Sequence, residues 1–284
     1  MDNFLVIPPA APLKTFIRYY VVADVMLDSN IPVLHEFVPL TFTALTFLEF
    51  PGMINYQVAG WDKGKKSFES SFIGPMSKPS YSTFICSGKM VTIHFSGTGI
   101  FRLFNLPQSD FLDTGDDASS ILNTQEIVHL RERIFTLSNP MDIAACLNHF
   151  FYGKLNTSKD WMNNIGAITS YINNKKGNIN IDWLTTQANM SVKTLERHFN
   201  EKIGLSPKLY ARIARFSHAM KMLRQNKGVF DIIEDCGYTD QSHFIKEMRE
   251  FSGRTPKLYY KMDKEEEFGL RLLLDNMPEE EKLK

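Results

Sequence analysis

The sequence predicts an α+β fold of two domains: a small N-terminal β-barrel or sandwich with trailing helices, then an all-α domain of two helix-turn-helix units joined by a long helix. Short runs rich in Val, Ile, Thr and Phe, separated by Pro and Gly, fill about the first 115 residues and are typical of strands. From about residue 161 the apolar residues recur with a helical period instead. The 284 residues, 43% of them hydrophobic, are enough for two cores.

The N-terminal domain is expected to span residues 1–153. Its strands should lie in the runs 38–50, 71–73, 82–86 and 90–95. Two helices should follow, at 124–137 and 142–152, and Ile127, Leu130 and Ile134 share one face of the first. That apolar face either packs on the β domain or forms a two-helix dimer seam, and the sequence leaves both open. A polar linker is expected at 154–160.

The clearest helix-turn-helix pattern lies between residues 231 and 260. Gly237 supplies a turn that a residue with a Cβ atom resists, and Asp240 can cap the helix that follows. Phe244, Met248 and Phe251 recur at helical spacing and can bury one face of a helix at 240–251. The other face would carry Gln241, Ser242, His243, Lys246 and Arg249. Such a polar face on a short helix is suited to reading bases in the major groove.

The same pattern occurs once more upstream. Asn189 stands where the second unit has Gly237, and Asn tolerates the left-handed conformation of a turn. A helix at 191–203 would bury Leu195, Phe199 and Ile203 and expose Lys193, Glu196, Arg197 and Asn200. A long helix should begin after Ser206 and run to Arg224, or roughly 28 Å. Two recognition helices near this separation could enter successive major-groove segments, which repeat about every 34 Å.

Residues 161–262 resemble the DNA-binding domain of the AraC/XylS family of bacterial transcription regulators. The resemblance rests on both halves of the pattern, including Gly204, Pro207, Tyr210 and the stretch from Gly237 to Phe244. It implies base-reading positions at Lys193, Glu196, Arg197, Gln241, Ser242, His243 and Lys246. We expect phosphate contacts from Asn200, Ser206, Arg212, Arg215 and Lys257. The N-terminal half resembles the cupin-like β sensory domains often joined to this domain.

Charge is unevenly distributed along the chain. The whole chain has 32 basic and 32 acidic residues, so its net charge gives no sign of a nucleic-acid partner. Residues 155–262, however, hold 17 Lys or Arg against 10 Asp or Glu, whereas residues 263–284 hold 4 against 8. The basic excess lies where the helix-turn-helix units lie, as a phosphate backbone requires. The acidic, partly apolar tail at 263–284 either packs on its own domain or contacts a partner or the basic face.

Several other classes of protein are disfavoured by the sequence. Cys86, Cys146 and Cys236 are scattered and form no CxxC pair, so buried free thiols are expected. The histidines have no metal-ligand spacing, and no cofactor or metal is expected. No apolar run is long enough for a membrane span and no leader is apparent, which predicts a cytoplasmic protein.

The expected partners are double-stranded DNA, with RNA polymerase, a homodimer partner and a small-molecule effector as further candidates. An effector pocket in the β domain would use Tyr56, Trp61, Phe72, His94 and Phe95, each of which is otherwise a core residue.

Three functions remain open on the sequence. The favoured one is a sequence-specific transcription regulator that is not an enzyme. An effector-free regulator controlled by protein contacts is the alternative. A DNA-repair enzyme carrying this domain is disfavoured, because it would need a four-cysteine zinc cluster and a nucleophile.

Overall fold

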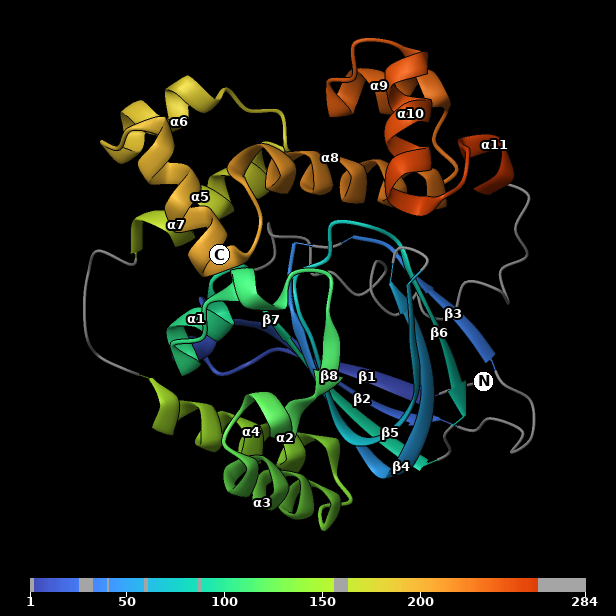
Figure 1. Ribbon diagram of the computed structural model, residues 1–284, viewed down its shortest axis with the longest axis vertical. Coiled ribbons are helices and arrows are strands. Elements are labelled where there is room, and N and C mark those ends of the chain that lie inside the picture. Colours follow the sequence, from blue (N-terminus) through green and yellow to red (C-terminus); the bar gives the residue numbers. More distant parts are fainter. Residues whose placement is uncertain are drawn as a thin grey trace.

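The computed structural model describes residues 3–25, 33–39, 41–58, 61–85, 88–155 and 163–259, and it shows a β domain beneath a layer of helices (Figure 1). This arrangement confirms the predicted α+β fold. Residues 156–160 of the predicted linker and the whole predicted tail, 263–284, lie outside the described residues, so the domain boundaries stay predictions. No helix in the described ranges is both long and apolar enough to cross a membrane.

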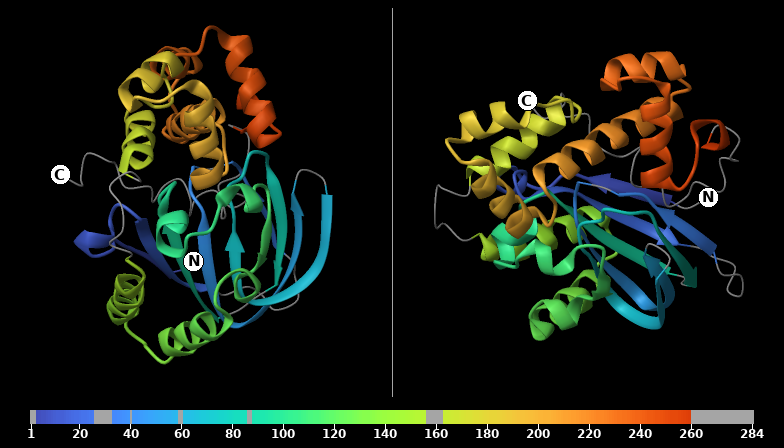
Figure 2. Two further views of the ribbon diagram at one scale, coloured as in Figure 1. Left: turned by 60° about the vertical axis from the view of Figure 1, so that its left-hand side comes forward. Right: turned by 45° about the horizontal axis from the view of Figure 1, so that its top comes forward.

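Within these ranges, eight strands form one antiparallel sheet in the order β1-β2-β7-β4-β5-β8, and β6 joins β3 to β4. The strands are β1 (Asn3–Ile7), β2 (Ile17–Val25), β3 (Val33–Phe37), β4 (Ala44–Val58), β5 (Trp61–Ile73), β6 (Ser80–Ile85), β7 (Gly88–Phe95) and β8 (Gly115–Asp117). The long β4 pairs with β7 through residues 44–48 and with β6 through residues 53–58. Because one strand serves two parts of the sheet, the sheet curls on itself (Figure 2).

The predicted strand at 38–50 is wrong in its first part, because β4 begins only at Ala44. The residues just before it leave the sheet and approach the C-terminal helices. Val38 and Phe42 are 1% and 6% exposed, and both belong to the hydrophobic core of the helical domain. The hydrophobic pattern does not reveal that these residues pack on the helical domain, because a buried segment that connects two domains and a buried strand have similar composition.

Alternation along the strands gives the sheet two different faces. Tyr20, Leu45, Phe72 and Phe95 point to the face that packs on helices and forms the N-terminal core. Those helices are α1 (Gly99–Phe104), α2 (Ala118–Ile121), α3 (Thr124–Phe135) and α4 (Pro140–Lys154), with short 3-10 turns η1 (Ala11–Leu13) and η2 (Gln108–Phe111) beside them. The opposite face carries a small cluster around Tyr19, Val21 and Ala23.

The apolar face of α3 packs on its own domain. Ile127, Leu130 and Ile134 are at most 5% exposed and belong to the N-terminal core. Asn123 caps α3 by accepting a hydrogen bond from the Glu126 amide, and Asn139 caps α4 in the same way from Met141. Of the two alternatives left open by the sequence, the structure therefore favours packing on the β domain over a dimer seam at this face.

The helical domain contains α5 (Asn163–Asn174), α6 (Ile181–Ala188), α7 (Val192–Ile203), α8 (Pro207–Arg224), α9 (Val229–Cys236), α10 (Gln241–Ser252) and α11 (Pro256–Tyr259). The long α8 has 18 residues and lies between a first unit of α6 and α7 and a second unit of α9 and α10 (Figure 1). The three helices whose bounds the sequence predicts, α7, α8 and α10, begin and end within one residue of the predicted positions, because caps act locally.

The two domains are in close contact. Gly204, which ends α7 with φ +78°, lies so close to η2 that an added Cβ atom would be 2.7 Å from the Gln108 carbonyl oxygen and 2.8 Å from Pro75 Cγ. Phe42 contributes to the core of the helical domain, as described above, and also contacts His94 of β7 edge-on at 5.0 Å between ring centroids. The first unit is therefore seated directly on the β domain.

Candidate nucleic-acid interface

The first unit presents a capped helix with an exposed polar face. Asn189 adopts the left-handed conformation, φ 50°, between α6 and α7, as its residue type allows. Ser191 then caps α7 by accepting a hydrogen bond from the Thr194 amide at 3.1 Å. Leu195 and Phe199 are fully buried beneath α7. The predicted base-reading residues Lys193, Glu196 and Arg197, together with Asn200, are exposed on its outer face.

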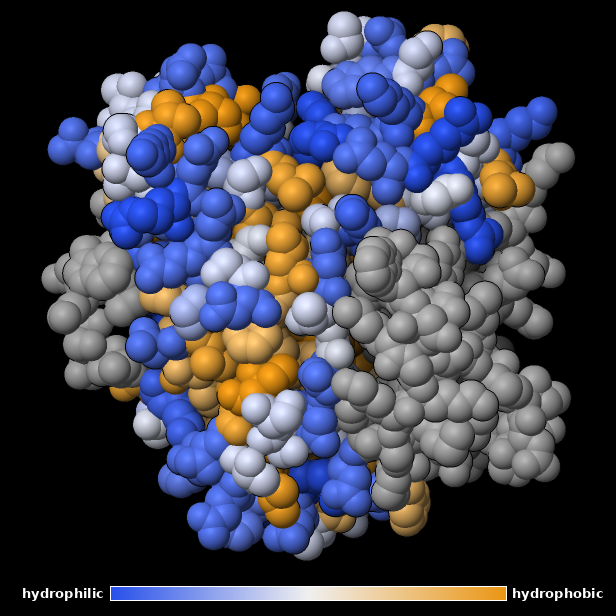
Figure 3. All heavy atoms as spheres, viewed as in Figure 1, coloured by the Kyte–Doolittle hydropathy of each residue, from blue (hydrophilic) through white to orange (hydrophobic). Residues whose placement is uncertain are grey.

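The second unit repeats this geometry with a glycine turn. Gly237 has φ 69°, and Asp240 caps α10 by accepting a hydrogen bond from the His243 amide at 2.8 Å. Phe244, Met248 and Phe251 are fully buried. The predicted base-reading residues Gln241, Ser242 and Lys246 are exposed. The space-filling view shows a mostly hydrophilic outer surface over both units (Figure 3).

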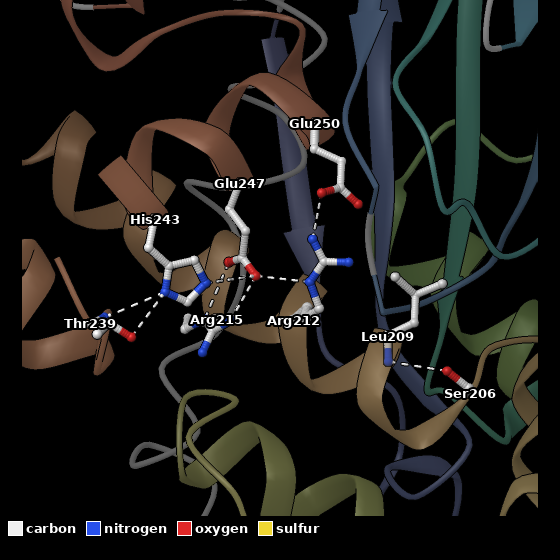
Figure 4. Close-up of polar contacts among 8 residues, drawn as sticks. All are labelled: Ser206, Leu209, Arg212, Arg215, Thr239, His243, Glu247 and Glu250. Atoms are coloured by element: carbon white, nitrogen blue, oxygen red, sulfur yellow. Dashed lines mark hydrogen bonds and ion pairs between the residues drawn. The ribbon is translucent and has the colours of Figure 1, made fainter. Parts of the chain in front are cut away.

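His243 differs from its predicted base-reading neighbours. Its Nδ1 atom lies 3.4 Å from the Thr239 amide nitrogen, and its Nε2 atom lies 3.9 Å from Oε1 of Glu247 (Figure 4). Tyr238 packs against the same ring edge-on. Both ring nitrogens thus face protein groups, and a base contact by His243 would require the ring to leave them.

Each unit is followed by a helix that starts with the same short sequence. Ser206 caps α8 by accepting a hydrogen bond from the Leu209 amide at 3.2 Å, and Thr255 accepts one from the Leu258 amide at 3.3 Å. Lys208 and Lys257 follow these caps at equivalent positions and are both exposed. Lys257 is a predicted phosphate contact, whereas Lys208 was missed. The repeated Pro-Lys-Leu-Tyr sequence is the signal that identifies it.

Arg212 and Arg215, two predicted phosphate contacts on α8, are both paired with acidic groups of α10. Arg215 Nη2 donates to Glu247 Oε1 at 2.6 Å, and Arg212 Nε donates to the same oxygen at 2.9 Å. Arg212 Nη2 also donates to Glu250 at 2.6 Å (Figure 4). Although burial alone would raise it, hydrogen bonds from Arg215 and Arg212 hold the pKa of Glu247 below its usual value. A phosphate would have to compete with these carboxylates.

The predicted effector residues fall into three groups. Phe72 and Phe95 are fully buried in the N-terminal core, which leaves them packing roles. The side chains of Tyr56 and Trp61 lie outside the described part of the chain. His94 is 1% exposed on the opposite face of the sheet, beside Tyr19 at 4.6 Å between ring centroids. Burial, aided by the charge of Arg18, lowers the pKa of His94 to about 3. The His94 ring is therefore neutral near pH 7.

One group of potential metal ligands is present in the described ranges, and the sequence did not reveal it. His218, Asp235 and Cys236 have ligand atoms within 4.8 Å of one another. Lys176 donates to Asp235 at 2.7 Å, and His218 Nε2 lies 2.6 Å from the same oxygen. Because the carboxylate is already held by a cation, this group is better described as an ion-pair cluster that joins α9 to α8 and to the segment just after α5.

The predicted free thiols Cys146 and Cys236 are both buried, whereas Cys86 lies outside the described residues.

Comparison with known proteins adds family evidence for both regions. Residues 184–262 match the family described as Helix-turn-helix domain, and residues 5–115 match a domain of unknown function, DUF6597. The HTH-type transcriptional activator RhaS of Escherichia coli O1:K1 is 36% identical over 67 residues. The RhaS protein of Escherichia coli O157:H7 is 34% identical over the same length. Each match covers 23% of this chain and only 24% of the relative's length.

Similar solved structures include ToxT from Vibrio cholerae O395, with a TM-score of 0.46 and 8% identity over 92% of this chain and 96% of that one. Unsaturated fatty acid bound ToxT from Vibrio cholerae strain SCE256 has a TM-score of 0.47 and 10% sequence identity. That match covers 84% of this chain and 99% of the ToxT chain. The helix-turn-helix match, residues 184–262, extends over α7, α8, α9, α10 and α11 and most of α6. This chain therefore has a C-terminal region that matches a helix-turn-helix domain, as its resemblance to the AraC/XylS family implies, after an N-terminal region that matches a domain of unknown function.

Proposed function

We propose that this protein is a sequence-specific transcription regulator that reads double-stranded DNA with α7 and α10. The observation that carries this proposal is the pair of capped helices, each with a buried apolar face and an exposed polar face, on either side of α8. The 18 residues of α8 correspond to roughly 27 Å. Two helices at this spacing are suited to successive major-groove segments on one side of the duplex.

Charge and relatives support the same proposal. The basic excess of residues 155–262 gives the helical domain the electrostatic footprint of a phosphate-binding surface. Lys208 and Lys257, exposed behind capped helix starts, are our candidates for phosphate contacts, with Asn200 and the cap residue Ser206 beside them. The relatives that share this domain are named transcriptional activators. We accordingly propose a regulatory rather than an enzymatic role, in the cytoplasm.

Selection from a random-sequence duplex library tests this function. The wild-type protein should retain a shared two-part motif at near-physiological salt. The double variant Arg197→Ala, Lys246→Ala should lose that motif, because one exposed reading residue is removed from each unit. A matched control, Lys14→Ala with Lys78→Ala, removes two exposed lysines of the N-terminal domain and should select the same motif as wild type. Retention of random sequences by the wild-type protein would contradict sequence-specific reading.

We further propose that the β domain controls this reading through Phe42, in response to a small-molecule effector. Tyr19 Oη and His94 Nδ1 are buried on one face of the sheet and have no hydrogen-bond partner among the described residues. Buried polar atoms of this kind are costly unless something satisfies them. Phe42 touches His94 and also belongs to the helical core, so a change at this face would reach the first unit.

The alternative is control by protein contacts, with a second copy of the chain or RNA polymerase as the partner. Thermal unfolding with a library of uncharged small molecules separates the two. A ligand that raises the melting temperature of wild type, but not of Tyr19→Phe, supports the effector. Stabilisation only by increasing protein concentration, with sedimentation showing a dimer, supports control by protein contacts.

A further inference from the structure

Glu247 is an acidic residue buried in the middle of the second recognition helix. Its side chain is 2% exposed, and its carboxylate lies between α10 and α8 (Figure 4). Arg215 donates to both of its oxygens, at 2.6 and 3.2 Å, and Arg212 donates to one of them at 2.9 Å. A buried carboxylate is retained only where such charge-assisted hydrogen bonds replace water.

The two arginines are themselves held in place by aromatic rings. The Arg215 guanidinium lies 4.8 Å from the ring centroid of Tyr238, and that of Arg212 lies 4.9 Å from the ring centroid of Phe251. Both rings are at most 5% exposed. Each guanidinium is thus fixed by a cation–π contact and by a carboxylate, so the network specifies how α10 lies on α8.

The first unit has different residues at the positions that form this network. Counted back from the shared Gly-x-Ser/Thr-Pro sequence, the position equivalent to Glu247 is His198, and that equivalent to Phe251 is Lys202. The first recognition helix is seated on the β domain instead, through Gly204 and η2. Orientation of α7 and of α10 therefore depends on different residues.

We propose that Glu247 is a positioning residue for DNA recognition: it holds α10 at a fixed angle on α8 through Arg212 and Arg215, and it keeps both arginines away from phosphate. This inference rests on the proposed function. It implies that base discrimination in the second half of the DNA site depends on Glu247, whereas discrimination in the first half does not. It also replaces the phosphate role that the sequence analysis predicts for the two arginines.

The test uses the full chain and the DNA site that wild type selects, with each half randomised in turn. Glu247→Gln keeps the size of the side chain and removes its charge, and we expect it to reduce discrimination in the second half about tenfold, a typical scale for a displaced reading helix. Discrimination in the first half should stay within about twofold. Glu250→Gln is the matched control, because Glu250 is 45% exposed and its ion pair within the described ranges is with Arg212; it should leave both halves nearly unchanged.

Arg215→Gln and the milder Arg212→Gln keep the inference testable if Glu247→Gln does not fold. Both should reproduce the loss in the second half and leave the salt dependence of binding unchanged, because neither arginine contacts phosphate. A salt slope reduced by about one ion, with discrimination intact, would assign the arginines to phosphate and overturn the inference. Equal loss in both halves of the site would reduce Glu247 to a general packing role. Wild type that discriminates in neither half would instead refute the proposed function itself.

Discussion

The two helix-turn-helix units share local structure and differ in what anchors them. Both have a left-handed turn residue, a capped recognition helix and a buried apolar face. The first unit is anchored by shape, since Gly204 fits against η2 and Phe42 enters the helical core. The second is anchored by charge, through Glu247 and through the contact of Lys176 and His218 with Asp235. From this difference we expect that a change in the β domain would reach the first unit more directly than the second.

Phe42→Ala should have the largest effect and tests the shape anchor. Removing a buried phenyl ring leaves a cavity between the domains and should cost about 3–5 kcal/mol of unfolding free energy. Urea unfolding measures the loss, and hydrogen exchange should show α7 losing protection before α10. Phe50→Ala, at a ring that is 57% exposed, is the control and should cost little. Equal loss of protection in α7 and α10 would mean that the units are not anchored separately.

Arg197→Ala tests reading by the first unit. Losing a base contact should cost about 1–3 kcal/mol at the selected site and relax preference at one base position. Competition binding with single-base variants of the site measures this change. Arg249→Ala, an exposed residue in the last turn of α10, is the comparison and should leave preference in the first half unchanged. If Arg197→Ala weakened all sequences equally, Arg197 would be a phosphate contact.

Acidification should reduce the stability contributions of His94, which contacts Phe42, and of the Glu247 and Asp235 carboxylates in different pH ranges. His94 has a folded-state pKa of about 3, so the unfolded chain binds an extra proton between about pH 6.5 and 3. Stability is therefore present above about pH 6.5 and declines as the pH falls, by about 2 kcal/mol at pH 5. The lowered pKa values of Glu247 and Asp235 make their contribution decline only at lower pH, below about pH 4. His218 also causes a loss of stability below about pH 6.5, because burial lowers its pKa, although less than that of His94.

Urea unfolding at pH 7 and pH 5 measures the histidine effect. His94→Phe should remove most of the difference in unfolding free energy between pH 7 and pH 5. His218→Asn, which changes the ion pair with Asp235, should leave most of that difference in place. A wild-type protein equally stable at both pH values would show that His94 is not held neutral.

The local features of both units could be predicted from the sequence, whereas their anchors could not. Ser191, Asp240, Asn189 and Gly237 act on amides within a few residues, so their types already specify the turns and caps. Glu247 looked like an ordinary polar residue, since its partners lie more than 30 positions away on α8. Phe42 likewise looked like part of a strand. Contacts set by the packing of distant segments leave no periodic signal in a single sequence.

The smallest expected effect is the loss of DNA affinity when Lys208 or Lys257 is replaced. These two lysines follow the caps of α8 and α11. Replacing a lysine that contacts phosphate with alanine should weaken binding to all sequences alike and reduce the salt slope by about one ion. Lys257→Ala should do so. Lys208→Ala should match it only if the start of α8, next to Gly204 and η2, remains accessible to the DNA backbone. Titrations at several salt concentrations decide this. A full effect at Lys257 with none at Lys208 would indicate that the contact with the β domain restricts the first unit's approach to DNA, and release of this contact would then be the step through which the proposed effector acts.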